Sequence, residues 1–243
     1  MNGTLFLVNE HHPLDWEPAE DLLVPADSRW PEIRLHVRAK VMLEQLLHHV
    51  GATSVIRPVS GYRPRAEQQQ LWEQSMAEHG AVFTRTYVAR PGCSEHQTGL
   101  AIDLGENIPE LDPICPSFPT DGPCGAFRRR AADFGFILRY PKGKETITGI
   151  GYEPWHFRYV GWPHARIMEE HGMVLEEYLQ WLRTFPLDGP HLHYRGLGRA
   201  FEVCYLPPSV TPQTEQPHPG MSLCQCSDTN DGGRVLTLWR DAG

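Results

Sequence analysis

The sequence has no long hydrophobic run, which argues against a membrane-spanning helix. Hydrophobic residues make up 40% of the 243 residues, yet no apolar stretch approaches the roughly 18 residues that cross a bilayer. Residues 1–10 hold no basic segment, and their apolar stretch is too short for a secretory signal. We therefore expect a protein without a membrane span that stays in the cytoplasm.

Positive charge and cysteine are also scarce. The 22 Lys and Arg residues are outnumbered by 30 Asp and Glu residues, and the net charge is −8. Because nucleic-acid binding needs a basic face for the phosphates, no nucleic-acid partner is expected. Six cysteines in a chain of this length are too few for a disulfide-stabilised scaffold.

Helix and strand signals alternate irregularly along the first two thirds of the chain. Apolar spacing and Pro or Gly boundaries predict helices over 31–50, 64–78, 125–134, 163–171 and 175–185. Strand-like runs lie at 5–8, 54–59, 99–104, 136–140 and 155–160. No regular βαβ repeat connects them, so we predict an α+β fold.

The character of the sequence changes after about residue 186. Residues 207–220 contain five prolines and predict an extended linker or loop. Strand candidates lie at 201–206, 221–226 and 234–239, and the Asn-Asp-Gly-Gly turn within 228–233 would join the last two as a hairpin. We predict two domains, 1–186 and a β-rich C-terminal extension over 187–243.

Thirteen histidines are the unusual feature of the composition, because imidazole is the commonest metal ligand in proteins. His96 and Asp103 lie seven residues apart, with Gly99 between them to allow a bend before the predicted strand. Together with His156 they offer two imidazoles and one carboxylate, a set that suits Zn²⁺ and leaves one coordination position open. That open position is typical of a catalytic zinc.

Two charged residues complete a hydrolytic set. Zinc lowers the pKa of a bound water to about 7, and Glu153, three residues before His156, can accept its proton without binding the metal. Arg63 supplies a cation for the oxyanion that forms when a carbonyl is attacked. These residues predict amide hydrolysis.

The order of these residues is also that of a known family. Ser94-x-His96-x(6)-Asp103 followed by Glu153-x-Trp155-His156 resembles the signature of the LAS-type zinc D,D-peptidases. The resemblance is closest to the VanX, VanY and especially bifunctional VanXY enzymes of vancomycin resistance. It runs to about residue 182, through the segments 61–63, 91–96, 135–141 and 152–161.

The resemblance implies a fold and an activity. The fold is a small, mostly antiparallel sheet flanked by helices, as in LAS and hedgehog-type metallopeptidases. The activity is hydrolysis of the D-Ala-D-Ala dipeptide, removal of the terminal D-Ala from peptidoglycan precursor pentapeptides, or both, in the bacterial cytoplasm. Such an enzyme contributes to vancomycin resistance.

The resemblance also implies a role for each matching residue. His96, Asp103 and His156 are the ligands of one catalytic zinc. Glu153 is the general base and acid, and Arg63 stabilises the tetrahedral intermediate.

Four further positions concern the substrate. Ser94 and Gln68 match positions that hold the C-terminal carboxylate of the substrate, and Trp155 lines the pocket. Ser60 stands where some VanXY-type relatives carry an acidic residue, and its neutral hydroxyl bears on the preference among small C-terminal D-residues. The Pro-rich loop over 105–124 is a candidate lid over the site.

Other interpretations remain open at this point. An exported cell-wall endopeptidase of the same superfamily would need a signal for export, and a non-catalytic zinc-stabilised module would bind wall precursors without cleaving them. Cys93 is not expected to be a nucleophile, because its neighbour His96 would be bound to metal. A second metal site in the extension (His191, His193, Cys204, Cys224, Cys226) matches no standard zinc-finger spacing, so reduced cysteines are expected there.

Overall fold

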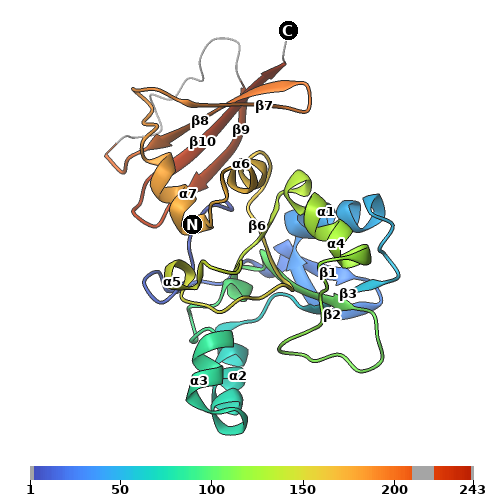
Figure 1. Ribbon diagram of the computed structural model, residues 1–243. Coiled ribbons are helices and arrows are strands. Elements are labelled where there is room, and N and C mark those ends of the chain that lie inside the picture. The colour runs from blue at the N-terminus through green and yellow to red at the C-terminus, as the bar shows by residue number, and fades with distance from the viewer. Residues whose placement is uncertain (1–2, 210–221, 242–243) are drawn as a thin grey trace. The chain divides into compact units, whose positions relative to one another are not determined.

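Figure 1 shows the computed structural model, in which residues 3–209 and 222–241 are described. The chain divides into two compact units, one formed by Val8–Arg166 and the other by Met1–Leu7 together with Ile167–Gly243. This division lies about twenty residues before the change in composition near residue 186. Within the described residues, no helix has both the length and the apolar character needed to cross a bilayer.

The unit Val8–Arg166 contains a sheet of four strands in the order β3-β4-β6-β5. Its strands are β3 (Ile56–Ser60), β4 (Ala101–Glu106), β5 (Phe136–Leu138) and β6 (His156–Tyr159). All three neighbouring pairs are antiparallel, which confirms the predicted α+β class and the antiparallel sheet. The first five residues of β4, a central strand, are all buried.

The start of the first predicted helix was wrong. Residues 31–36 belong to strand β2 (Trp30–His36), which forms an antiparallel hairpin with β1 (Leu23–Asp27), and helix α1 covers only Val37–His49. Pro31 indicates a helix start in the sequence, but a proline also fits the beginning of a strand. Pairing with β1 decides between the two, and local spacing does not reveal that pairing.

The remaining helices of this unit follow the predictions more closely, with two omissions. They are α2 (Arg65–Glu78), α3 (Gly80–Tyr87), α4 (Gly122–Arg130), α5 (Glu145–Thr148) and α6 (His164–His171), with 3-10 helices η1 (Glu20–Leu22), η2 (Glu95–Thr98) and η3 (Ala131–Phe134). Helix α6 extends past the boundary of the unit. The short helix α5 was not predicted. Helix α3 was not predicted either, because Gly80 reads as a stop signal. With φ at +78°, Gly80 instead lets the chain turn and begin a second helix.

An aromatic core supports strand β6. The rings of Phe118, Phe127 and Phe157 meet edge to face, with centroids 5.0–5.7 Å apart. Successive side chains of a strand point to opposite faces, so Phe157 faces this core while His156 and Arg158 face the other side. The core side chain thereby fixes the strand that carries the two polar residues.

The second unit contains another four-stranded antiparallel sheet, in the order β7-β8-β10-β9. Its elements are α7 (Leu175–Leu182), β7 (Leu192–Gly196), β8 (Arg199–Leu206), β9 (Ser222–Asp228) and β10 (Arg234–Asp241). The predicted hairpin across 228–233 is confirmed by the β9–β10 pairing. Most of the predicted Pro-rich linker lies outside the described residues.

The predicted strand over residues 5–8 was wrong. These residues are largely buried but form no strand. The backbone N–H of Leu5 donates to the Ser227 hydroxyl at 2.8 Å instead of joining a strand ladder. Side-chain hydrogen bonding by Ser227 therefore replaces the sheet pairing that the apolar run suggests.

Candidate metal centre

The register of two central strands brings Asp103 and His156 together. Asp103 of β4 is paired with His156 of β6, and on its other side with Ser60 of β3. Directly opposed residues of antiparallel strands point to the same face. The carboxylate of Asp103 therefore meets the ring of His156, with 2.9 Å between Oδ1 and Nδ1.

His96 reaches the same point from the 3-10 helix η2. Gly99 ends this helix with φ at +69°, so the chain turns directly into β4. The Nδ1 of His96 lies 2.7 Å from the carbonyl oxygen of Gly61, which can only accept, so this nitrogen carries the proton. The other ring nitrogen, Nε2, is left facing Asp103 at 3.1 Å from Oδ2.

The three predicted ligands thus converge. One nitrogen or oxygen atom of each of His96, Asp103 and His156 lies within 4.8 Å of the other two, and all three side chains are buried. Within residues 3–209 and 222–241, no other cluster of His, Cys, Asp and Glu has this geometry. The second metal site considered for the extension is therefore absent from the described side chains, which do not include Cys224.

The electrostatics of the group favour a cation between these side chains. Burial opposes ionisation, but His96 and His156 nevertheless hold the pKa of Asp103 well below its usual range. Burial likewise opposes a charge on His156, yet Asp103, Glu95 and Glu153 raise the pKa of His156 to about 10. The position attracts a positive charge, which a proton or a divalent metal ion can supply.

Glu153 lies beside this group without being part of it. Its Oε2 is 3.7 Å from Nδ1 of His156, and its side chain is almost completely buried. Burial, reinforced by the charge of Asp103, raises the pKa of Glu153 to about 8. A carboxyl group that titrates near neutral pH suits proton transfer in both directions.

Arg63 is held by two neutral partners. One guanidinium nitrogen donates to Oε1 of Gln68 at 2.9 Å, and another donates to the hydroxyl of Ser60. The amide nitrogen of Gln68 in turn donates to the carbonyl oxygen of Ala89 at 2.7 Å. Among the described residues no carboxylate forms an ion pair with Arg63, so its charge is available to a ligand.

All the predicted site residues line one cavity of about 900 Å³. They are Ser60, Arg63, Gln68, Ser94, His96, Asp103, Glu153, Trp155 and His156. Asp112, Pro113 and Ile114 of the predicted lid loop line the same cavity. Cys93 does not line the cavity, and burial raises the pKa of its thiol, which agrees with the expectation that it is not a nucleophile.

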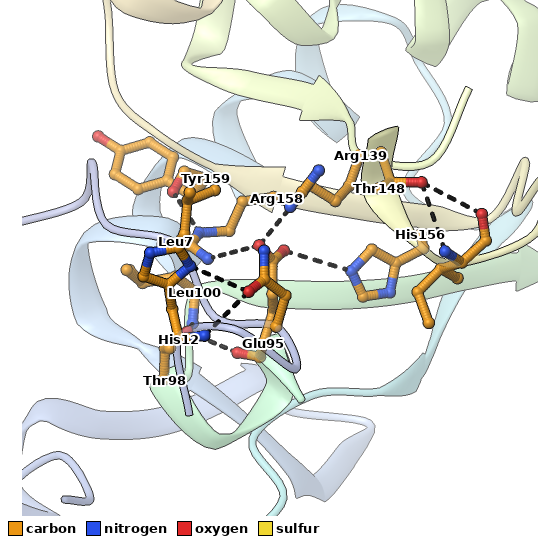
Figure 2. Close-up of polar contacts among 12 residues, drawn as sticks. Leu7, His12, Glu95, Thr98, Leu100, Arg139, Thr148, His156, Arg158 and Tyr159 are labelled. Atoms are coloured by element: carbon orange, nitrogen blue, oxygen red, sulfur yellow. Dashed lines mark hydrogen bonds and ion pairs between the residues drawn. The ribbon is translucent and has the colours of Figure 1, made fainter. Parts of the chain in front are cut away.

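Three buried charged residues next to the candidate ligands were not predicted. Figure 2 shows Glu95 beside Arg139, Arg158 and His156, and Glu95 and both arginines are at most 1% exposed. Burial disfavours the charged form of Glu95, but the two guanidinium groups hold its pKa well below the usual range. A signal for Arg158 exists in the sequence, because it follows His156 by two residues on a strand and so shares its face.

Comparison with known proteins gives one family and close relatives. The family model VanY, D-alanyl-D-alanine carboxypeptidase, matches residues 32–162. The bifunctional D-Ala-D-Ala dipeptidase and D-Ala-D-Ala carboxypeptidase VanXYC of Enterococcus gallinarum is 44% identical over 183 residues, which are 74% of this chain and 95% of that protein.

Solved structures similar to this chain include two vancomycin-resistance enzymes. The vancomycin-resistance D,D-dipeptidase VanXYg in complex with a D-Ala-D-Ala phosphinate analogue has 42% identity and a TM-score of 0.90, over 98% of this chain and 94% of that one. VanY from the VanB-type resistance cassette in complex with Zn(II) has 32% identity and a TM-score of 0.59, over 72% of this chain and 98% of that one.

These similarities and the geometry lead to the same conclusion. The match to VanXYg extends the likeness over the C-terminal extension as well. The Zn(II)-containing relative and the buried His96–Asp103–His156 group together support a zinc site in this chain. The chain belongs to the VanY family of D-alanyl-D-alanine carboxypeptidases.

Proposed function

We propose that this protein is a zinc metallopeptidase that hydrolyses D-Ala-D-Ala and removes the terminal D-Ala from peptidoglycan precursors, and so contributes to vancomycin resistance. The observation that carries the proposal is the buried His96–Asp103–His156 group with Glu153 beside it. The curated relative with 44% identity carries both activities in its name, and the VanXYg relative was solved with an analogue of D-Ala-D-Ala.

Each side chain has a defined part in the hydrolysis. Zinc held by His96, Asp103 and His156 would supply Lewis acidity at the scissile carbonyl. Glu153 takes the proton from the attacking water and later passes it to the amine that leaves. Arg63 stabilises the negative charge that develops on the carbonyl oxygen.

The other cavity residues bind or orient the substrate. Ser94 and Trp155 line the cavity near the ligands, and we assign the substrate carboxylate to Ser94 and packing to Trp155. Gln68 and Ser60 act through Arg63, because both hold its guanidinium group. The neutral Ser60 hydroxyl leaves the charge of Arg63 uncompensated, which favours a substrate with a carboxylate.

The cavity has room for more than a dipeptide. Its volume of about 900 Å³ lies near the upper end of the roughly 300–1,000 Å³ found for ligand sites. A longer peptide that ends in D-Ala-D-Ala can therefore extend into the parts of the cavity lined by α2 and by residues 112–114. This supports carboxypeptidase activity in addition to dipeptidase activity.

We further propose one zinc ion per chain, a peptidase domain over 1–186 and a location in the bacterial cytoplasm. The single His-Asp-His group of the described residues supports one zinc. The 183 residues aligned with VanXYC support a domain of this size. Cys93, Cys115 and Cys124 are free thiols, as expected in a reducing compartment, and cell fractionation of the native host tests the location.

The test compares D-Ala release by the zinc-loaded protein and its Glu153→Ala variant. The substrates are D-Ala-D-Ala and a precursor pentapeptide that ends in it. We expect the variant to bind zinc but to lose about 10²- to 10⁴-fold in rate, the usual contribution of a general base. Glu145→Ala, at an exposed position of α5, should keep the full rate.

Two results would contradict the proposal. Equal rates for the protein and its Glu153→Ala variant would remove Glu153 from the mechanism. If the zinc-loaded protein releases no D-Ala from either substrate, it is not a peptidase of this specificity, and binding of either substrate without cleavage would indicate a precursor-binding module.

A further inference from the structure

The two histidines of the metal centre are supported by different groups. His96 donates from Nδ1 to the neutral carbonyl of Gly61 at 2.7 Å. The Nε2 of His156 instead faces the carboxylate of Glu95, with 3.7 Å between Nε2 and Oε2. Among the described residues both of these atoms are buried and have no hydrogen-bond partner, so each is the other's nearest available partner.

Glu95 is itself held rigidly on its other oxygen. The Nε of Arg139 donates to Oε1 at 2.8 Å, and Nη1 of Arg158 lies 3.0 Å from the same atom. All three side chains have no more than 1% of their surface exposed. Figure 2 shows the carboxylate between the guanidinium groups and the ring of His156. One oxygen is thereby used by the arginines and the second remains for the imidazole.

The sheet explains why these groups meet. Arg158 follows His156 by two residues on β6 and lies on the same face. The backbone N–H of Arg139 donates to the carbonyl oxygen of His156 at 3.2 Å, so Arg139 lies directly across from it. Arg158 is thus placed by the strand that carries His156, Arg139 directly follows the neighbouring strand β5, and Glu95 comes from η2 next to His96.

We propose that Glu95, fixed by Arg139 and Arg158, is the positioning residue that keeps the proton of His156 on Nε2 and turns Nδ1 toward the metal. A carboxylate acceptor behind a ligating imidazole fixes the tautomer and ring orientation and makes the ligand more basic. Because Gly61 has the same position behind Nδ1 of His96, the two histidines present opposite nitrogens, Nε2 and Nδ1, to the ion.

The inference rests on the zinc ligands of the proposed function, and it is tested by metal binding. We expect Glu95→Gln to raise the zinc dissociation constant about 10- to 100-fold, the usual effect of losing such a partner. Ser227→Ala is the matched control, because it removes a buried hydrogen bond to Leu5. Both residues belong to the unit that does not contain the metal centre. The substitution lowers stability without touching the ligands.

A spectroscopic measurement on the unaltered protein makes the test independent of the variant's folding. In the ¹⁵N-labelled, zinc-loaded protein, we expect His156 to carry its proton on Nε2 and to exchange it slowly. The ring of His193, whose side chain is 71% exposed, provides the fast-exchange reference. In a folded Glu95→Gln variant the Nε2–H signal should move upfield.

Three outcomes would overturn the positioning role. They are a folded Glu95→Gln variant with the zinc affinity of the parent, an equal loss of affinity in Ser227→Ala, and a His156 proton on Nδ1. None of them depends on turnover, whereas failure of the zinc-saturated parent protein to release D-Ala would contradict the proposed function alone.

Discussion

At the scale of single residues, the site is built from charged side chains, and neutral or ionised neighbours set the orientation of each. Arg63 has no carboxylate partner among the described residues and is oriented by Gln68 and Ser60. Asp103 lies between two imidazoles. Since a guanidinium group is useful to a transition state only where it is correctly placed, the neutral contacts of Arg63 matter as much as its charge.

Replacement of Gln68 tests this orientation. Gln68→Ala removes the acceptor of Arg63 at 2.9 Å, and we expect kcat/KM for D-Ala-D-Ala to fall about tenfold, the effect of losing roughly 1.4 kcal/mol of transition-state stabilisation. Zinc affinity should not change. The assay is D-Ala release together with metal titration.

The neighbouring residue provides the control for Gln68. Gln69 is exposed on the same helix α2 and bonds only to Glu73 among the described residues, so Gln69→Ala should leave kcat/KM unchanged. If Gln68→Ala retains the parent value while Arg63→Ala does not, the orientation of Arg63 does not depend on Gln68.

At the scale of secondary-structure elements, strand register and one turn assemble the ligands. Between Pro58 and Ser60 the pairing of β3 with β4 shifts by one residue, a β-bulge that places Ser60 opposite Asp103. Such bulges are common beside active sites, where they redirect a side chain. The turn at Gly99 then connects His96 to the strand of Asp103.

Substitution of Gly99 should be costly for two separable reasons. Its φ of +69° disfavours any side chain, and a Cβ atom would lie 2.8 Å from Cδ2 of Leu23. We expect Gly99→Ala to lower the free energy of unfolding by about 2–4 kcal/mol, combining left-handed strain with overpacking. Denaturant titration of the zinc-loaded protein measures the loss.

Gly149 separates the two contributions. It has a similar φ of +74° but open space where a Cβ would be added, so Gly149→Ala should lose only about 1–2 kcal/mol, the backbone contribution. Equal losses in the two variants would show that packing against Leu23 does not restrict position 99.

At the scale of the whole molecule, stability depends on buried groups whose protonation differs between the folded and unfolded chain. His164 is completely buried, and burial lowers its pKa to about 3. In the unfolded chain the same ring takes up a proton once the pH falls below its ordinary pKa of about 6.5. Protonation therefore favours unfolding, and stability is lost as the pH falls from 6.5 toward 3.

The expected pH dependence can be isolated with one substitution. Between pH 7 and pH 5 the contribution of His164 should weaken stability by about 2 kcal/mol. His164→Gln should remove that part of the pH dependence, measured as the difference in unfolding free energy between the two proteins at each pH. His193→Gln, at an exposed side chain, should show the same dependence of unfolding free energy on pH as the unaltered protein. A His164→Gln curve parallel to that of the unaltered protein would contradict the assignment.

The overall fold class, and His96 with Asp103 as a candidate ligand pair, could be predicted because they depend on residues close in sequence. His96 and Asp103 lie on either side of the turn at Gly99. Glu153 lies three residues before His156, within one short loop. Helix α2 and the β9–β10 hairpin have strong local boundaries for the same reason. Local spacing and boundary residues, together with the resemblance to the LAS-type peptidases, indicated zinc chemistry in an α+β fold.

The strand β2, the helix α3 and the surroundings of the site were decided only by tertiary structure. Residues 31–36 become a strand because β1 pairs with them, and the carboxylate of Glu95 meets Arg139 and Arg158 only after three segments fold together. In the same way, Gly61 meets Nδ1 of His96 and Glu95 faces Nε2 of His156 only in the folded chain. Such contacts join residues far apart in the chain, where neither spacing nor local propensity carries information about them.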